Sequence, residues 1–379
     1  MSITFHLLPD ICEVIMGQSP PGDTYNESGV GLPFFQGKSE FGDLNPIPHK
    51  WCSAPRKTAE VGDILLSVRA PVGPTNIADR RCCIGRGLAA LRAKNEIVLP
   101  DYLRYAIKYF EPKLASMGQG STFEAISKAD LHSLLIPIRD LRKQAVIVQL
   151  MMLSEEIISL RKASLKKIEE FIPSLFLDIF GNIVINEKNW KVESFSSVGT
   201  LDRGKSRHRP RDAAHLYGGR YPFIQTGDVA NCGGLITTYS NTYSEEGLAQ
   251  SRLWDIDTLC ITIAANIAKT GILKIKACFP DSVVGFTADK SKVTNRYVQT
   301  WLSFLQPILE ANAPQAAQKN INLQILRELP IPVPPLELQN LFEEKVTQIN
   351  LLRLNQIEAI NKSNDLFNSL LFEYFSSPI

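Results

Sequence analysis

Residues 141–180 read LRKQAVIVQLMMLSEEIISLRKASLKKIEEFIPSLFLDIF, and residues 336–375 read LELQNLFEEKVTQINLLRLNQIEAINKSNDLFNSLLFEYF. Neither stretch contains a glycine, and Pro173 is the only proline in them. In the first stretch an apolar residue recurs at seven-residue steps, at Met151, Ile158, Leu165, Ile172 and Ile179. The second stretch has a looser apolar stripe at Phe342, Val346, Ile349, Ile360, Phe367 and Leu370. These patterns predict two long helices, each on the order of 55 to 60 Å.

The two helical stretches belong to an internal repeat with an offset of 195 residues. The same offset relates residues 101–105, 136–138 and 174–176 to residues 296–300, 331–333 and 369–371. Upstream the offset falls to 194 between Asp63 and Asp257 and to 187 between residues 17–19 and 204–206. The sequence therefore predicts one unit used twice, with early loops of different length.

Each repeat begins with short β-branched runs, turn residues and one helical segment, which are typical of an α+β domain. We predict a first domain at residues 1–140, a long helix at 141–182, a second domain at 183–335 and a second long helix at 336–379. A long helix with one apolar stripe is marginal in water, so we expect the two helices to pair as an antiparallel two-stranded coiled coil between the domains, with approximate twofold symmetry. Two independent domains, each with its own terminal helix, remain the alternative.

Composition limits the class of protein without identifying it. The chain has 379 residues, with 41 Lys and Arg against 39 Asp and Glu, so its net charge carries no information about partners. Seven cysteines without a CxxC pair indicate reduced thiols in the cytosol. No leader sequence and no apolar run long enough to span a membrane is present, so we expect a soluble, cytoplasmic protein.

Motifs for catalysis and cofactor binding do not survive inspection. Residues 199–206, GTLDRGKS, match a phosphate-loop pattern, but the first repeat has no lysine at the equivalent place and the next residues are a poor start for a helix. Residues 85–90, GRGLAA, match a loose dinucleotide pattern, which we interpret as a turn with an exposed arginine before a strand. The five histidines form no metal-binding cluster, so we expect no catalytic residue, no metal and no cofactor on this chain.

Basic and polar loops carry the functional signal. Between residues 203 and 211 the second repeat has six basic side chains, at Arg203, Lys205, Arg207, His208, Arg209 and Arg211. The first repeat has a looser basic cluster, at Arg80, Arg81, Arg86 and Arg92. Polar loops recur at residues 118–122 and 315–320. Such loops suit phosphate contacts and hydrogen bonds to base edges, because Arg reads guanine and Asn or Gln reads adenine.

Several stretches resemble the DNA-specificity subunit of type I restriction-modification systems. They are PFFQGK, PFIQTGDV, VGDILLSVRAPVG, IDTLCITIAANIAKTGIL, GQGSTFEAISKADLHSLLIPI and AAQKNINLQILRELPIPVPPLELQ, and a long helix follows each domain. The resemblance covers nearly the whole chain. It departs from the family where an acidic residue usually precedes the glutamine at the start of each long helix, since Lys143 and Leu338 stand there.

The resemblance implies two target-recognition domains that each read one half of a split double-stranded DNA target. The helices would set the spacer and dock two modification subunits, which bring S-adenosylmethionine, while restriction subunits add ATP- and Mg-dependent translocation and cleavage. The chain itself would be non-catalytic and prokaryotic. Because the loops of the two repeats differ, we expect an asymmetric target.

We select candidate residues from the basic and polar loops and from the polar faces of the helices. DNA-facing candidates in the first domain are Lys38, Arg69, Arg81, Arg86, Ser121 and Thr122. Those in the second domain are Lys205, Arg207, Arg209, Thr226, Asn266, Lys269, Lys319 and Asn320. Partner-binding candidates on the helices are Arg161, Lys162, Lys166, Glu169, Arg353 and Glu358. A non-catalytic scaffold that binds protein partners along the helices remains an alternative function, and an ATP-dependent enzyme using residues 199–206 is a third.

Overall fold

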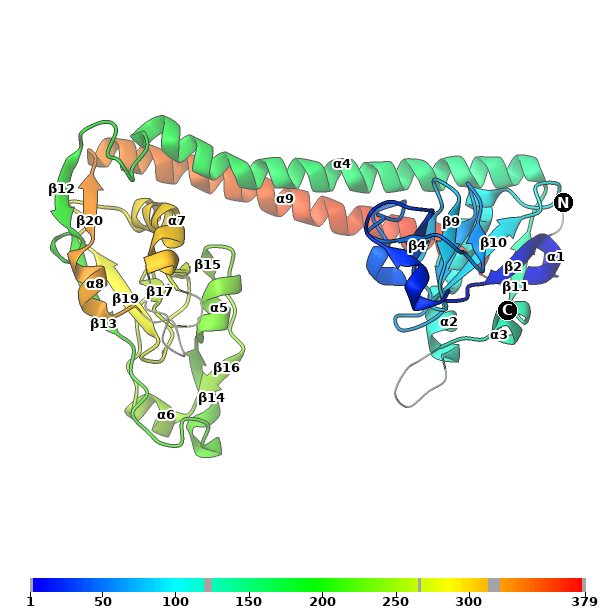
Figure 1. The fold of residues 1–379 in the computed structure, drawn as a ribbon. Coiled ribbons are helices and arrows are strands. Elements are labelled where there is room, and N and C mark those ends of the chain that lie inside the picture. Colours follow the sequence, from blue (N-terminus) through cyan, green and yellow to red (C-terminus); the bar gives the residue numbers. More distant parts are fainter. Residues whose placement is uncertain (1–2, 119–124, 265–266, 313–320, 377–379) are drawn as a thin grey trace. The chain divides into compact units, whose positions relative to one another are not determined.

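The computed structural model describes residues 3–118, 125–264, 267–312 and 321–376. The chain divides into two compact units, the first formed by residues 1–163 and 357–379 and the second by residues 164–356. Each unit contains one α+β domain and a part of both long helices (Figure 1). The α+β class, the internal repeat and the two long helices predicted from the sequence are confirmed.

The first domain is built on an antiparallel sheet with the strand order β2-β10-β7-β8. These strands are β2 (Cys12–Met16), β10 (Leu88–Ala93), β7 (Ile64–Ser67) and β8 (Thr75–Ile77). Helix α2 (Pro100–Met117) packs on the sheet, where Tyr102, Leu103 and Ile107 are fully buried with Leu66 and Leu91. The apolar residues recur along one side of α2, so burying them fixes the helix against the sheet.

A second, mixed sheet of the first domain carries the segment between β2 and β10. Its order is β3-β5-β4-β9-β6, with β3 (Tyr25–Asn26), β5 (Trp51–Cys52), β4 (Leu32–Phe35), β9 (Cys82–Ile84) and β6 (Thr58–Ala59). The remaining elements are β1 (Thr4–Leu7), α1 (Leu8–Ile11), α3 (Lys128–His132) and β11 (Leu135–Ile138). Strands β1 and β11 pair antiparallel, so the start of the domain lies beside the segment that leads into the first long helix.

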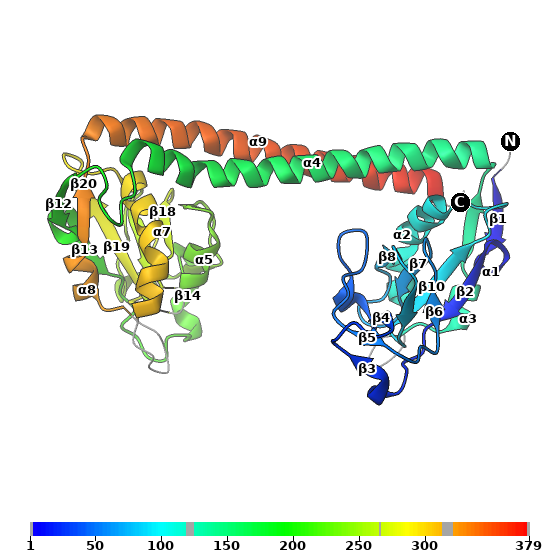
Figure 2. The ribbon, with the colours of Figure 1, turned by 45° about the horizontal axis from the view of Figure 1, so that its top comes forward.

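The second domain repeats this plan with the strand order β13-β19-β17-β18-β15. The strands are β13 (Gly199–Arg203), β19 (Val283–Ala288), β17 (Leu259–Thr262), β18 (Thr270–Leu273) and β15 (Leu235–Ile236). Helix α7 (Asn295–Asn312) covers this sheet (Figure 2), with Tyr297, Val298 and Trp301 in the same core as Leu259 and Phe286. The other elements are β12 (Lys191–Ser194), β14 (Tyr217–Phe223), α5 (Thr226–Asn231), β16 (Asn241–Tyr243), α6 (Glu245–Ala249), α8 (Leu323–Glu328) and β20 (Pro330–Val333).

The offset between the repeats changes once rather than drifting. It is 187 residues from β1 to β12 and from β2 to β13, and 195 residues from β7 to β17 and onward. Our pairing of Asp63 with Asp257 is therefore wrong by one residue. The equivalent of Asp257 is Gly62, because both have positive φ, 66° and 88°, and both donate their N–H to the neighbouring strand. The eight additional residues of the second domain lie between β13 and β17, outside the common frame.

The long helices are α4 (Leu141–Phe180) and α9 (Leu336–Phe375). In the first unit Ile147, Met151 and Ile158 of α4 share a core with Phe367, Leu371 and Phe375 of α9. In the second unit Phe176 and Phe180 of α4 share a core with Phe342 and Val346 of α9. The beginning of each helix thus packs with the end of the other, so the pairing is antiparallel in both units, as predicted.

A buried glutamine fixes the first turns of each long helix to its domain. The Gln144 side chain donates to the carbonyls of Ile97 and Arg139 at 2.9 and 2.7 Å and accepts from Leu99 N at 2.9 Å. Gln339, 195 residues later, donates to Lys292 O and Pro334 O and accepts from Thr294 N in the same way. Both glutamines are completely buried, and a buried amide with all its partners orients the chain that it bonds.

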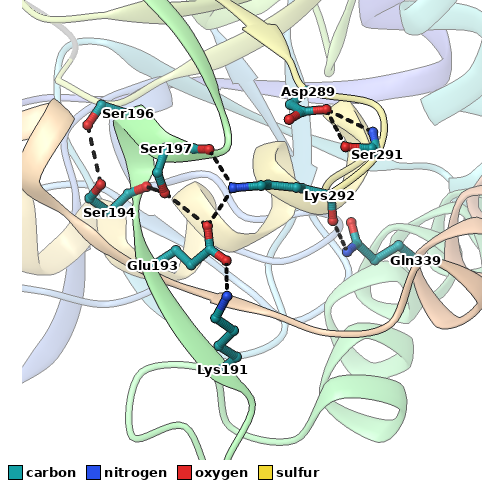
Figure 3. Close-up of polar contacts among 9 residues, drawn as sticks. All are labelled: Lys191, Glu193, Ser194, Ser196, Ser197, Asp289, Ser291, Lys292 and Gln339. Carbon is teal, nitrogen blue, oxygen red and sulfur yellow. Dashed lines mark hydrogen bonds and ion pairs between the residues drawn. The ribbon is translucent and has the colours of Figure 1, made fainter.

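The second domain adds an ionic cluster beside this glutamine (Figure 3). Glu193 on β12 accepts from Lys191 at 2.7 Å, from Lys292 at 2.8 Å and from Ser197 at 3.1 Å. The hydrogen bonds from Lys191, Lys292 and Ser197 lower the pKa of Glu193 to about 2. Lys292 also donates to Ser197 O, and its own carbonyl accepts from Gln339, so the cluster joins β12 to the start of α9.

Candidate nucleic-acid interface

Four loops of the first domain meet at one edge of its sheets. Strands β2 and β7 are antiparallel to β10, so both end where β10 begins. Strands β4 and β9 are parallel, so both end on the same side. We call the resulting surface the loop edge of the first domain and define it as residues 17–19, 36–38, 68–69 and 85–87.

Backbone hydrogen bonds hold these loops together. Gly17 N donates to Leu88 O at 2.8 Å, Gln18 N to Ile84 O at 3.0 Å and Val68 N to Gly87 O at 2.9 Å. A Cβ on Gly17 would lie 2.2 Å from Gly85 O, so only glycine permits this approach. The loop edge is therefore a closely packed backbone surface from which the side chains project.

The second domain rebuilds the same edge at equivalent positions. Gly204 N donates to Val283 O at 2.9 Å, Lys205 N to Phe279 O at 3.1 Å and Ile263 N to Ser282 O at 3.0 Å. A Cβ on Gly204 would lie 2.2 Å from Phe279 O. We define the loop edge of the second domain as residues 204–207, 225–227, 263–264 and 280–282. The two edges share their backbone bonds and their essential glycine.

The side chains on the two loop edges differ. The first edge carries Gln18, Ser19, Gln36, Lys38, Arg69 and Arg86, and the equivalent positions of the second carry Lys205, Ser206, Gln225, Gly227, Ala264 and Asp281. A common frame with different hydrogen-bonding groups can place two different recognition surfaces in the same way. Sequence reasoning overlooked Gln36 and Gln225, although PFFQGK and PFIQTGDV carry a glutamine at the same position of both repeats.

Three of the predicted residues of the first domain lie on its loop edge. Lys38, Arg69 and Arg86 are exposed, and none of them forms an ion pair within the described part of the chain. Arg81 lies at the opposite end of β9, where it pairs with Glu60 at 3.1 Å. Ser121 and Thr122 lie outside the described residues.

The predicted residues of the second domain also gather around its loop edge. Lys205 and Arg207 are exposed on the edge, and Arg207 N donates to Gln250 Oε1 at 2.5 Å. Arg209 donates to two carbonyls of its own loop, Ser206 O and His208 O, both at 2.8 Å. Thr226 begins α5, and Lys269 donates to Gln306 at 3.2 Å across from the end of β17. Asn266, Lys319 and Asn320 lie outside the described residues.

Sequence reasoning also missed an ion pair on the second edge. Arg211 donates to both carboxylate oxygens of Asp281, at 3.0 and 2.9 Å. Asp281 stands where the first domain has Arg86, so a free arginine on one edge is replaced by a neutralised one on the other. Only the packing of two distant loops produces this pair.

The candidate partner-binding residues lie on the exposed or partly buried faces of the long helices. Glu169 and Arg353 pair with each other at 3.0 Å between α4 and α9 in the second unit. Glu358 pairs with Lys362 at 2.7 Å along α9. Lys162 and Lys166 are exposed, and Arg161 is partly buried. Exposed apolar side chains accompany them on α4, at Leu150, Leu153, Ile157 and Leu160.

The motifs set aside in the sequence are structural. Residues 199–203 form strand β13, and no helix begins directly after Lys205 and Ser206, so the phosphate-loop match lacks its geometry. Residues 85–87 form the turn between β9 and β10, as predicted, with Arg86 exposed. Among the described residues no group of His, Cys, Asp and Glu is arranged to hold a metal ion. None of the described helices is both long and apolar enough to cross a membrane.

Comparison with known proteins supplies the family. The model of the type I restriction modification DNA specificity domain matches residues 5–170 and again residues 187–366. The putative type I restriction enzyme MjaX specificity subunit of Methanocaldococcus jannaschii is 42% identical over 158 residues, which are 42% of this chain and 37% of that protein. The MjaIX specificity subunit of the same organism is 28% identical over 144 residues, 38% of this chain and 32% of that protein. The matched part thus spans less than two fifths of each relative.

A solved structure shows the same fold over the whole chain. The S subunit of a type I restriction-modification system from M. genitalium covers 100% of this chain and 97% of its own, with a TM-score of 0.57 and 13% identity. The fold and the repeated frame define a two-domain protein with paired long helices. With the family model matching both repeats, the chain belongs to the family of type I restriction modification DNA specificity domains.

Proposed function

We propose that this chain is the DNA-specificity subunit of a type I restriction-modification enzyme. Each domain reads one half of a bipartite, asymmetric target with its loop edge. The observation that carries this proposal is the pair of loop edges, which share backbone bonds and differ in side chains. Two readers built on one frame but bearing different groups select two different half-sites.

The chemistry of the loop edges supports contact with DNA. Lys38, Arg69 and Arg86 on one edge and Lys205 and Arg207 on the other are cations without a carboxylate partner among the described residues. Free cations lower their energy by replacing counterions on phosphates, and the neighbouring glutamines and serines can bond base edges. The neutral chain as a whole hides this local positive charge.

The chain is non-catalytic in this proposal, and its partners supply the chemistry. Two modification subunits dock on the long helices, which also set the spacer between the half-sites. The exposed leucines and isoleucine of α4 support docking, because an apolar stripe on a helix is stabilised when a partner covers it. S-adenosylmethionine, ATP and Mg belong to the modification and restriction subunits, and the complex works in the cytoplasm of a prokaryote.

Co-expression with a type I modification subunit from the same genome tests the proposal. Single-molecule sequencing of host DNA should then reveal N6-methyladenine in a split, asymmetric motif that disappears when this chain is deleted. A stable complex that methylates no motif would contradict the proposal and favour a protein scaffold. ATP titration of the isolated chain by calorimetry should give no binding heat.

A further inference from the structure

We propose that Arg86 reads a guanine in the half-site of the first domain, with Ser19 and Gln36 as positioning residues. This inference rests on the proposed function and assigns one base contact within it. Arg86 lies at the tip of the turn between β9 and β10, on the first loop edge. Arginine recognises guanine by donating two parallel hydrogen bonds to O6 and N7 in the major groove.

The backbone of the turn is held on every side. Gly85 N donates to Phe35 O at 2.8 Å, and Gly87 N donates to Gln36 O at 3.1 Å. Arg86 N donates to Ser19 Oγ at 3.3 Å. Ser19 in turn bonds the side-chain amide of Gln36, with Gln36 Nε2 to Ser19 Oγ at 3.1 Å. The Cα of Arg86 is therefore fixed between two other loops, which reduces the entropy lost when its side chain binds.

Glycine is required on both sides of Arg86. A Cβ on Gly85 would lie 2.5 Å from Gln36 Oε1, and a Cβ on Gly87 would lie 2.3 Å from Gln36 O. The turn can pack this closely against residue 36 only because both neighbours lack side chains. Arg86 is the one residue of the tripeptide with a side chain, and that side chain is exposed.

The guanidinium of Arg86 is also free to bind. Within the described residues it has no hydrogen bond or ion pair, whereas three other arginines of the same domain are engaged. Arg80 pairs with Asp79 at 2.7 Å, Arg81 with Glu60 at 3.1 Å and Arg92 with Asp63 at 2.8 Å. A fixed backbone with an unpaired planar donor group is the arrangement that bidentate recognition needs.

The second domain provides a natural contrast. Its equivalent residue is Asp281, whose carboxylate is occupied by Arg211 through two hydrogen bonds. The second loop edge therefore lacks a free arginine at this position. The inference predicts that replacing Arg86 affects only one half of the target.

The test uses the full chain co-expressed with its modification subunit and compares methylated motifs in host DNA. We expect R86A and R86K to lose discrimination for guanine at one position of one half-site, by about 5- to 150-fold. The lysine variant keeps the charge and loses the planar fork, so it separates base reading from phosphate contact. The other half-site should stay unchanged in both variants.

The matched control is R80A, because Arg80 is exposed in the same domain but paired with Asp79. S19A tests positioning: discrimination at the same position should fall while the salt dependence of binding stays unchanged. Unchanged motifs in R86A and R86K, or uniform weakening over all sequences, would overturn the inference alone. A wild-type complex that methylates no motif would overturn the proposed function with it.

Discussion

Replacing Glu155 by glutamine should loosen the attachment of α2 to α4 in the first unit. Glu155 on α4 accepts from Arg104 at 3.0 Å, from Lys108 at 2.9 Å and from the Tyr105 hydroxyl at 2.8 Å. All three donors come from α2. Burial alone would raise the pKa of Glu155, but the hydrogen bonds and charges of Arg104 and Lys108 outweigh it and lower this pKa to about 2.

The lowered pKa sets the size of the expected effect. A fall from the ordinary 4.5 to about 2 corresponds to about 3 kcal/mol of preference for the charged form. The Glu155 side chain is 30% exposed, so solvent screening reduces our expectation to about 2 kcal/mol. Because the folded pKa lies below the unfolded one, this stabilisation is complete above about pH 4.5 and is lost as the pH falls through about 2.

Hydrogen exchange of the α2 amides measures this change in the first unit directly. A loss of about 2 kcal/mol should make the protected amides of α2 exchange about 30-fold faster in E155Q. The matched control is E358Q, which removes an exposed carboxylate that pairs with Lys362 at 2.7 Å and should change exchange by less than 3-fold. Unchanged α2 exchange in E155Q, or an equal acceleration in E358Q, would refute the reasoning.

Three further predictions concern the loop edges and the thiols. R207A should lower the slope of log affinity for DNA against log salt by about 0.9, whereas R220A, whose arginine pairs with Glu245, should not; equal slopes would remove Arg207 from the interface. G17A should abolish methylation of the first half-site, because the new Cβ meets Gly85 O, while G22A, with nothing within 4 Å, should keep it; a normal motif in G17A would contradict the packing. Burial raises the pKa of Cys12, Cys82 and Cys83 to about 12, so of seven thiols only the partly exposed Cys232 should react quickly with a thiol reagent at pH 8. C232S should remove that reaction, and fast labelling of several thiols would show that the cores open.

The local elements were predictable because their signals are short-range. Helix periodicity in residues 141–180 and 336–375 predicted α4 and α9 from their first residues, although the helices end at Phe180 and Phe375. The Pro-containing strands β11 and β20 and the turn around Arg86 were predictable for the same reason. The alignment of Asp63 failed by one residue, since only the positive φ shared by Gly62 and Asp257 identifies the equivalent turn.

The candidate interface was only partly predictable. Basic composition pointed to Lys38, Arg69, Arg86 and Lys205, which do lie on the loop edges. The same composition also pointed to Arg81, which pairs with Glu60 instead. A count of charges cannot tell a free cation from a paired one, because pairing depends on which strands are neighbours.

The sequence by itself determined the repeat, the α+β class and the long helices, because periodicity and propensity act within a few turns of chain. The tertiary structure alone decided which distant loops share an edge. Ser19, Gln36 and Arg86 meet because β4 and β9 are parallel and β2 and β10 are antiparallel, and such pairings join residues up to 67 positions apart. Long-range strand pairing is set by burial of the whole core, so no local pattern in the sequence encodes it.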